Sequence, residues 1–468
     1  MNDSVTDTGR GAPAPAHRVV VTGLGATTAL GGNVAETWEG LVRGESGLVL
    51  LDGEEWTKEA PPVLGARAKV EPGLALGHQE RRRLSRSARF AVEAAAEAWA
   101  DAGLDDGRVP GHRLGVVVSA ALGDMTSIID GWETLKARGW RRVPPMTVPM
   151  SMGNGPAAAV ALLVHARLGV HATVNACSSG TQALVTAAGL IRRGEADVVV
   201  AGGAEAPLHP MVLASFGAMR ALSQRFDDPA SACRPYDADR DGMVLGEGAG
   251  IVVLESERHA RERGARIYAE LAGVGVSSDA YHMVQPEPGG TGSAAALRAS
   301  LADAGASPAE VGHVNVNGTA TLPGDAAEAR ALADVFGPAD VSAVPDGGRE
   351  GLPGEEDEDG VRGPAITANK SMTGHGLGAA GAIESISTVL ALHHGLIPPT
   401  RNFARPDEGV TLDIVHGAPR KTGPERLYAV KNSAGFGGHN VALTFRSVST
   451  HPEPGGRRGG EAPGEGGR

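Results

Sequence analysis

The sequence predicts an α/β protein built from buried strands and a duplicated core. Short runs rich in valine, leucine and isoleucine alternate with alanine-rich stretches of helical character along most of the 468 residues. Examples are residues 18–24, 114–119, 197–201 and 251–254. Continuous apolar runs of this length are typical of strands covered by helices on both faces. The length and the 41% content of hydrophobic residues allow one large unit or two related halves.

The second half of the chain resembles the first in the order of its segments and in their pattern of apolar and small residues. The paired segments are residues 19–26 with 269–277, residues 112–124 with 312–325, residues 173–188 with 366–382, and residues 248–254 with 431–443. A repeat on this scale indicates a duplicated α/β half, and a site is expected at the junction of two such halves. We therefore predict an N-terminal half at 18–265 and a C-terminal half at 266–446.

Three segments lack the apolar residues that would anchor them. Residues 1–17 and 447–468 are predicted to be disordered ends. Residues 345–363 contain the acidic run from Glu355 to Asp359 and are interpreted as an inserted surface loop, with a mobile lid as the alternative.

Charge and cysteine content exclude several classes of protein. The formal net charge of -12 argues against nucleic acid or an anionic membrane as the main partner. The two cysteines form neither a disulfide framework nor a metal-binding CxxC cluster, which favours a reducing, cytoplasmic location. No signal peptide and no apolar run long enough to cross a bilayer is recognisable.

Cys177 is the best candidate nucleophile. It lies in the stretch TVNACSSGT, where a β-rich run is expected to end at Ala176 and a helix to begin at Ser178 and Ser179. The N–H groups and the positive dipole end of a helix N-terminus favour a thiolate over a thiol, and can stabilise an oxyanion on an attacked thioester. The other cysteine, Cys233, has no such context and is interpreted as structural.

Five motifs in order resemble the β-ketoacyl-acyl carrier protein synthases of the elongating type, including polyketide ketosynthases. The resemblance covers residues 18–446. The motifs are VVTGLGATTALG at 20–31, NACSSG at 175–180, RPYDADRDGMVLGEGAG at 234–250, KSMTGHGLGAAG at 370–381 and NSAGFGGHN at 432–440. This resemblance implies the thiolase fold, a duplicated five-layered αβαβα architecture, which agrees with the repeat.

The resemblance also implies roles for individual residues. Cys177 matches the active-site cysteine, Lys370 the catalytic lysine and His375 a catalytic histidine. Phe436 matches the gating phenylalanine, with Gly435 and Gly437 as the neighbours that let it move, and the amides of Cys177 and Phe436 would form the oxyanion hole. No cofactor is implied, because the substrate arrives on the phosphopantetheine arm of a carrier protein.

One position departs from the family pattern. The family's second histidine lies in a VNAHGTST-type motif, whereas this chain reads VNVNGTAT and carries Asn317 there. An asparagine can donate a neutral N–H bond, but it neither titrates near pH 7 nor carries charge. All the groups needed for acyl transfer to Cys177 are present. The rate of malonyl decarboxylation, in contrast, would fall by roughly 10²–10³ if the family's histidine acts as a base or a cation.

Three versions of the second step therefore remain open. The enzyme could still condense malonyl units, could transfer acyl groups without elongation, or could close a ring within the tethered chain by an aldol, lactone or lactam reaction. Ring closure is the preferred hypothesis, because tethering supplies about 10⁵–10⁸ M of effective concentration. A non-catalytic subunit of a ketosynthase heterodimer is the alternative of another class, although such subunits typically replace the nucleophile. A hydrolase using Cys177 with His375 is disfavoured by the ordered motifs.

A basic cluster indicates the carrier-protein partner. Residues 80–90 read ERRRLSRSARF, and the resemblance places carrier docking at Arg82 and Arg83, with a solvated helix face as the alternative. Family members are usually homodimers, and the apolar residues 160–174 fit a partner interface. A heterodimer is the alternative.

Overall fold

A computed structural model of the chain describes residues 17–52, 61–73, 76–104, 109–338, 363–423 and 427–448. The segments predicted as disordered ends, and all of the acidic insertion except its last residue, thus lie outside the described residues or at their margins. No helix in the described ranges combines the length and apolarity needed to cross a membrane.

In the described residues, the main sheet has ten strands in the order β11-β10-β14-β15-β9-β1-β8-β6-β4-β5. They are β1 (Val19–Thr27), β4 (Leu114–Ser119), β5 (Val170–His171), β6 (Val198–Glu205), β8 (Gly248–Ser256), β9 (Ala269–Ser278), β10 (Val311–Asn315), β11 (Ala365–Thr367), β14 (Tyr428–Gly435) and β15 (His439–Arg446). The short strands β2 (Val49–Leu50), β3 (Leu64–Ala66) and β7 (Leu245–Gly246) form a second sheet, and β12 (Leu396–Ile397) pairs with β13 (Arg420–Lys421).

The strand order confirms the predicted duplication. Counted outward from the β1–β9 contact, one half runs β1-β8-β6-β4-β5 and the other β9-β15-β14-β10-β11, with the same sequence of antiparallel and parallel pairings. Within the main sheet, the two halves meet where β1 pairs with β9, Val20 with Glu270 and Val21 with Ala269. The predicted match of residues 248–254 with 431–443 began too early in the second half. The structural counterpart of β8 is β15, which begins at His439.

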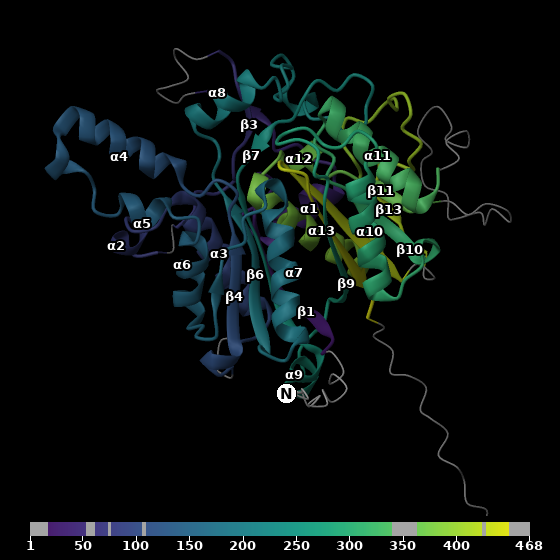
Figure 1. Cartoon of the computed structure of the whole chain (residues 1–468), viewed down its shortest axis with the longest axis horizontal. Coiled ribbons are helices and arrows are strands. Elements are labelled where there is room, and N and C mark those ends of the chain that lie inside the picture. Colours follow the sequence, from purple (N-terminus) through teal and green to yellow (C-terminus); the bar gives the residue numbers. More distant parts are fainter. Residues whose placement is uncertain are drawn as a thin grey trace, which may run out of the picture.

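The helices complete a layered arrangement (Figure 1). One layer holds α3 (Arg86–Asp101) and α6 (Gly155–Val164), and the opposite layer holds α10 (Thr291–Ala304) and α11 (Leu322–Phe336). Between the two halves of the sheet lie α7 (Ser179–Arg192) and α13 (Ala380–His394). The remaining helices are α1 (Val34–Val42), α2 (His78–Arg81), α4 (Met125–Arg138), α5 (Thr147–Ser151), α8 (Pro210–Ala218), α9 (Glu257–Glu262) and α12 (Lys370–Thr373).

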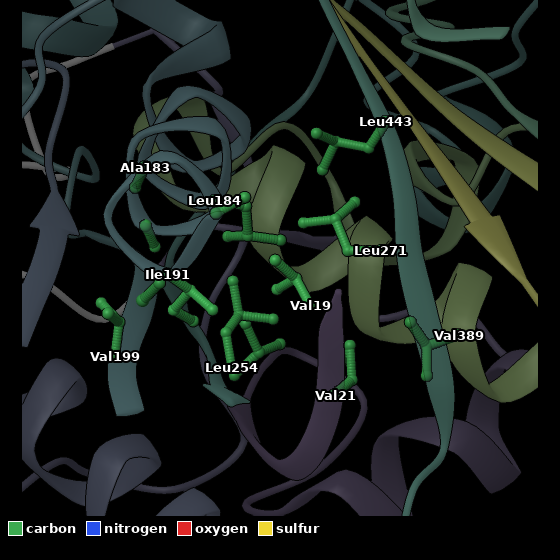
Figure 2. Packing of buried hydrophobic residues seen from close by; sticks show 14 of the residues in the cluster. Val19, Val21, Ala183, Leu184, Ile191, Val199, Leu254, Leu271, Val389 and Leu443 are labelled. Carbon is green, nitrogen blue, oxygen red and sulfur yellow. The ribbon is translucent and has the colours of Figure 1, made fainter. Parts of the chain in front are cut away.

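The central core joins both halves. Val19 and Val21 of β1 pack with Leu184 and Ile191 of α7 and with Leu271 of β9 (Figure 2). Leu443 of β15 and Val389 of α13 belong to the same cluster, and these side chains are essentially inaccessible to solvent. Because α7 and α13 are held by one continuous apolar core, the loops that precede these two helices are fixed relative to each other.

Candidate active site

Cys177 lies in a tight turn directly before α7. The 3₁₀ turn Ala176–Ser178 leads into the helix, and Ala176 has a left-handed backbone with φ of 47°. Such a conformation is unfavourable for a residue with a side chain and is found at sites where the chain must present a group in a fixed direction. The predicted strand to Ala176 was wrong in extent, because β5 ends at His171 and no strand connects it to the turn.

The end of β14 closes on this turn. A Cβ on Gly435 would stand 2.6 Å from Asn175 O and 3.2 Å from Cys177 N, so only glycine fits. The backbone N–H groups of Phe436 and of Cys177 itself lie close enough to the Cys177 sulfur to favour its thiolate. The Phe436 ring lies 6.1 Å from the Phe216 ring of α8. Two convergent N–H groups beside a sulfur form the geometry of an oxyanion hole for a thioester.

Cys177 is a thiol at neutral pH, which corrects the expectation of a resting thiolate. Burial raises the pKa of Cys177 to about 11, although the charge of Lys370 and the N–H groups of Phe436 and Cys177 act in the opposite direction. The apolar neighbours come from α8, among them Leu213 and Phe216. Desolvation thus outweighs the helix N-terminus, and the proton must leave the sulfur as the acyl group arrives.

A cavity of about 280 Å³ brings most of the predicted site residues together. Its wall includes Cys177, Asn317, His375, Gly435 and Phe436. Lys370 and Gly437 are not part of this wall: Lys370 is buried behind Asn317, and Gly437 donates its N–H to Met283 O in the neighbouring loop. His375 is the only imidazole on the cavity wall within the described residues.

Asn317 is held on both sides of its backbone. Its N–H donates to Glu328 Oε1 at 2.7 Å, and its carbonyl accepts from Lys370 Nζ at 2.6 Å. The side-chain oxygen also accepts from Lys370 Nζ, at 3.4 Å. Because an ammonium group can only donate, the side-chain atom that faces Lys370 must be the amide oxygen and not the amide nitrogen. Asn317 Nδ2 therefore remains as a neutral donor at the cavity.

Behind Asn317, two lysines share one carboxylate. Lys370 Nζ lies 2.7 Å from Glu384 Oε1, and Lys431 Nζ lies 2.7 Å from Glu384 Oε2. All three side chains are at most 2% exposed. Lys431 also donates to the carbonyls of Val316 and Asn315, at 3.0 and 3.4 Å, and to that of Asn432. Burial of charge at this level is tolerated only when each ion is paired and hydrogen-bonded.

His375 is a neutral imidazole. It is 2% exposed, its Nδ1 has no hydrogen-bond partner, and its main chain is fixed by hydrogen bonds with Val244 and Gly246. Burial lowers the pKa of His375 well below its usual range, and the charges of Lys370 and Lys431 lower it further. A neutral imidazole beside the sulfur can accept a proton or donate one N–H bond.

Glu205 is a buried carboxyl on the other side of the site. It lies at the end of β6 and accepts N–H bonds from Ala121 at 2.6 Å, Gly378 at 3.1 Å and Leu122 at 3.4 Å. Burial raises the pKa of Glu205 to about 7, although these N–H bonds lower it. Its charge would raise the pKa of Cys177, so a neutral Glu205 makes the sulfur easier to ionise.

The predicted docking arginines line a separate surface groove. Arg82 and Arg83 are exposed at the end of α2 and lie in a groove of about 590 Å³, whose other wall includes Ser127 and Asp130 of α4 and Thr147 of α5. Arg86, part of the same sequence cluster, is not available for docking because it forms ion pairs with Glu247 and Glu71.

Cys233 and Cys177 are both buried free cysteines, so burial alone does not distinguish their roles. In the part of the chain that the structure describes, no group of His, Cys, Asp or Glu is arranged to hold a metal ion.

Sequence reasoning missed Lys431, Glu384 and Glu205. Each is a charged residue inside an otherwise apolar run, YAVKNSAG, AGAIESIS and VVVAGGAE respectively. A single charge within a stretch expected to be buried is a usable signal, because such a charge needs a buried partner.

Comparison with known proteins places this geometry in a family. The family models for the N-terminal and C-terminal domains of beta-ketoacyl synthases match residues 16–260 and residues 268–345 with 354–404. The 3-oxoacyl-[acyl-carrier-protein] synthase 2 of Vibrio cholerae is 38% identical over 432 residues, covering 92% of this chain and 99% of the relative. The corresponding protein of Mycobacterium tuberculosis is 40% identical over 431 residues, covering 91% and 96%.

Solved structures agree. The ishigamide ketosynthase/chain length factor matches with a TM-score of 0.81 and 30% identity, over 93% of this chain and 100% of that one. A type II PKS ketosynthase solved in complex with its acyl-carrier protein matches with a TM-score of 0.77 and 31% identity, over 92% and 100%. The layered fold is therefore the thiolase fold, and the chain belongs to the β-ketoacyl synthase family.

Proposed function

We propose that this ketosynthase takes an acyl chain from a carrier protein onto Cys177 and then closes a ring within that chain. The observation that carries the proposal is the cavity itself, which combines a nucleophilic sulfur with one neutral imidazole, His375, and a non-titrating amide, Asn317. The loading parts are complete, whereas the groups for stabilising a charged extender unit are reduced to neutral donors.

The loading step follows from the turn at Cys177. As the sulfur attacks the carrier thioester, the carbonyl oxygen becomes negative and receives the N–H groups of Cys177 and Phe436. The carbon–sulfur bond to the phosphopantetheine arm breaks, and the proton from Cys177 leaves with the arm's thiol. His375 is the available base for carrying that proton, because it is uncharged at neutral pH.

The second step uses the same imidazole. His375 removes a proton from a hydroxyl, an amine or an acidic carbon of the tethered chain. For a lactone or lactam, the new nucleophile attacks the thioester carbonyl, the bond to Cys177 breaks and the proton returns to sulfur. For an aldol closure, the carbon nucleophile attacks a ketone within the chain and the proton passes to the new alkoxide. The ring then stays bound to Cys177 until water cleaves the thioester. Tethering contributes about 10⁵–10⁸ M of effective concentration, so the neutral polar groups of the cavity are sufficient to catalyse the closure.

Decarboxylative condensation with a malonyl unit is the second candidate. The relatives at 38% and 40% identity carry the name of that activity, and Asn317 Nδ2 with His375 provides two neutral donors at the cavity. Acyl transfer without elongation uses the loading step alone.

One experiment separates these reactions. Candidate acyl-carrier thioesters are incubated with the wild type and with Cys177→Ala, and the protein mass is followed. We expect an adduct on the wild type only, followed by release of a cyclic product without any extender. Carbon dioxide from added malonyl-carrier protein would instead support condensation. Transfer of the unchanged acyl group to a second carrier would support simple transfer. No adduct at all would indicate a non-catalytic subunit.

Replacing Asn317 by histidine tests the role given to that position. Asn317→His should raise carbon dioxide release from malonyl-carrier protein by about 100-fold, because a titratable imidazole is restored. Unchanged release would show that Asn317 is not what limits decarboxylation.

We also propose carrier docking at Arg82 and Arg83 and assembly as a homodimer. The acyl-carrier protein complex among the structural neighbours supports a carrier as partner. Strand β5 is an exposed edge of the main sheet, and Leu162, Leu163 and Val174 beside it are 78%, 40% and 56% exposed. An apolar edge of this kind favours pairing with another chain. Light scattering of the purified chain should give twice the monomer mass, and a monomer would point to a heterodimer with another subunit.

A further inference from the structure

Lys431 has no part in the reaction as described so far, yet it is a fully buried cation next to the site. Its side chain is 0% exposed and projects from β14, the strand that ends at Gly435, directly before Phe436. It does not reach the cavity wall. Burying an ammonium group carries a desolvation cost that close pairing and hydrogen bonds must offset.

The contacts of Lys431 converge on the segment that carries Asn317. Lys431 Nζ holds the carbonyls of Asn315 and Val316, and Lys370 Nζ holds the carbonyl of Asn317. Three consecutive carbonyls are therefore bound by two ammonium groups. Glu384 bridges these two groups, with one oxygen 2.7 Å from each nitrogen. The strand end that positions the Asn317 amide is thus fixed by this bridge.

The bridge also sets the local charge. Two buried carboxylates, Glu384 and Glu328, act on the two ammonium groups, and Glu328 also accepts the N–H of Asn317. Without Lys431, Lys370 alone would face both carboxylates, and the region behind Asn317 would carry an excess of negative charge. With Lys431, the two carboxylates are matched by two ammonium groups. Charge in a low-dielectric interior acts over longer distances than in water.

We propose that Lys431 is a positioning residue for the second step: it holds the Asn317 amide at the cavity and balances the negative charge of the carboxylates behind it. The proposal rests on the proposed function for the step it serves. An asparagine fixed in this way presents its N–H to a developing oxyanion, and the positive charge of Lys431 keeps an unmatched carboxylate from repelling that oxyanion. Lys431 thereby supplies from behind a charge that the side chain at 317 does not carry.

The first test replaces Lys431 by methionine, which has a similar length and no charge. We expect Lys431→Met to take up the acyl group on Cys177 within about twofold of the wild-type rate. Loss of that group with product formation should fall about tenfold, the size expected when a group that orients a reacting side chain is removed. Lys421→Met, the same change at an exposed lysine on β13, is the matched control and should match the wild type in both steps.

A double-mutant cycle shows whether Lys431 acts through Asn317. In an Asn317→Ala background, Lys431→Met should have little further effect on the second step, because the amide it positions is absent. Independent, additive losses would overturn the proposal, as would a parallel loss of loading, of the second step and of the unfolding midpoint. If the methionine variant does not fold, Lys431→Gln keeps a donor to the carbonyls and still removes the charge.

The charge is read directly from pH dependence. Burial lowers the pKa of Lys431 to about 8, so its charge is present below pH 8 and lost above it. The second step should therefore slow as pH rises through about 8 in the wild type, and Lys431→Met should lack this decline. The titratable groups that face Lys431 from the surrounding elements are His313, Glu328, Lys370, His375 and Glu384.

Titration of the nearby imidazoles tests the charge of Lys431 without relying on the proposed function. The charge of Lys431 lowers the pKa of both His313 and His375. Ring-nitrogen NMR of Lys431→Met should show both pKa values moved upward, with Lys421→Met unchanged. If the wild type never takes an acyl group, the proposed function fails while this measurement still decides the role of the charge. Identical imidazole titrations in wild type and Lys431→Met would overturn it.

Discussion

The two halves of this ketosynthase build the same turn and use it differently. Before α7 the turn is Ala176–Ser178, and before α13 it is Leu377–Ala379, and each begins with a left-handed residue, at φ of 47° and 44°. Cys177 thus corresponds to Gly378 in the other half. The end of β6, Glu205, likewise corresponds to Gly435 at the end of β14.

This correspondence explains why one turn is a site and the other is not. At the turn before α13, the Glu205 carboxylate accepts the N–H groups of Gly378 and Ala121. At the turn before α7, the matching position is Gly435, which has no side chain, so the N–H groups of Cys177 and Phe436 converge on the sulfur. Glu205 occupies in one half the place that a substrate oxyanion would take in the other.

The halves also differ in charge. Cys177 belongs to a cluster of apolar side chains, and burial raises the pKa of the Glu205 carboxyl, which acts on the sulfur, to about 7. The C-terminal half instead contributes Lys370, Lys431 and Glu384 as a buried ionic cluster. One half thus provides a neutral nucleophile and the other the fixed charge, which is the division that the following experiments test.

The largest effect is expected where the ionic cluster loses its carboxylate. Glu384→Gln removes the carboxylate that the two buried ammonium groups share and should lower the free energy of unfolding by about 3–5 kcal/mol. Urea denaturation measures it. Glu39→Gln, which removes one of the two exposed partners of Arg43, should change the value by less than about 0.5 kcal/mol. Equal effects of the two changes would show that the buried cluster does not stabilise the fold.

The next effect tests the position that Glu205 fills in the other half. In Gly435→Ala the new methyl group would meet Asn175 O and Cys177 N, displacing the turn and the N–H groups that face the sulfur. Acylation of Cys177, followed by protein mass, should slow about 100-fold. Gly153→Ala is the control, since nothing lies within 4 Å of a Cβ there. If Gly435→Ala loaded the acyl group at the normal rate, the oxyanion hole would not lie at this end of β14.

A smaller effect concerns Glu205 itself. Its pKa rises from 4.5 to about 7 on folding, so its contribution to stability is present below pH 4.5 and is lost as pH rises to about 7. Glu205→Gln has no carboxyl to ionise, and the wild type should therefore lose about 1–3 kcal/mol more than the variant between pH 5 and 7.5. Urea unfolding at the two pH values decides this, and equal losses would mean that Glu205 is ionised without penalty.

The sequence predicted the fold and the nucleophile better than the electrostatics. Valine-rich runs and the repeat were sufficient for the layered duplication, because burial on both faces leaves a clear local pattern. Cys177, Asn317 and His375 were placed in one cavity because their motifs lie in loops at the junction of the halves. The ionisation of Cys177 was predicted wrongly, since desolvation depends on residues such as Leu213 and Phe216 that are distant in sequence.

The buried charges illustrate the same limit. Lys431 and Glu384 lie 47 positions apart in the numbering and meet only because β14 and α13 pack together, so no local pattern reveals the pair. Arg86 was grouped with Arg82 and Arg83 by its neighbours in the sequence. It pairs with Glu247, a partner that only the fold brings within reach.

The smallest effect, and the most direct test of the neutral nucleophile, is the alkylation of Cys177 by iodoacetamide as pH is varied. Only the thiolate reacts, and with a pKa of about 11 its fraction rises about tenfold for each pH unit between 7 and 9. Protein mass follows the reaction, and Cys177→Ala gives the background from Cys233, whose pKa burial raises to about 12. A rate that has levelled off by pH 8 would mean that the N–H groups and Lys370 overcome desolvation. Cys177 would then rest as a thiolate and load without a base, and His375 would be needed for the second step alone.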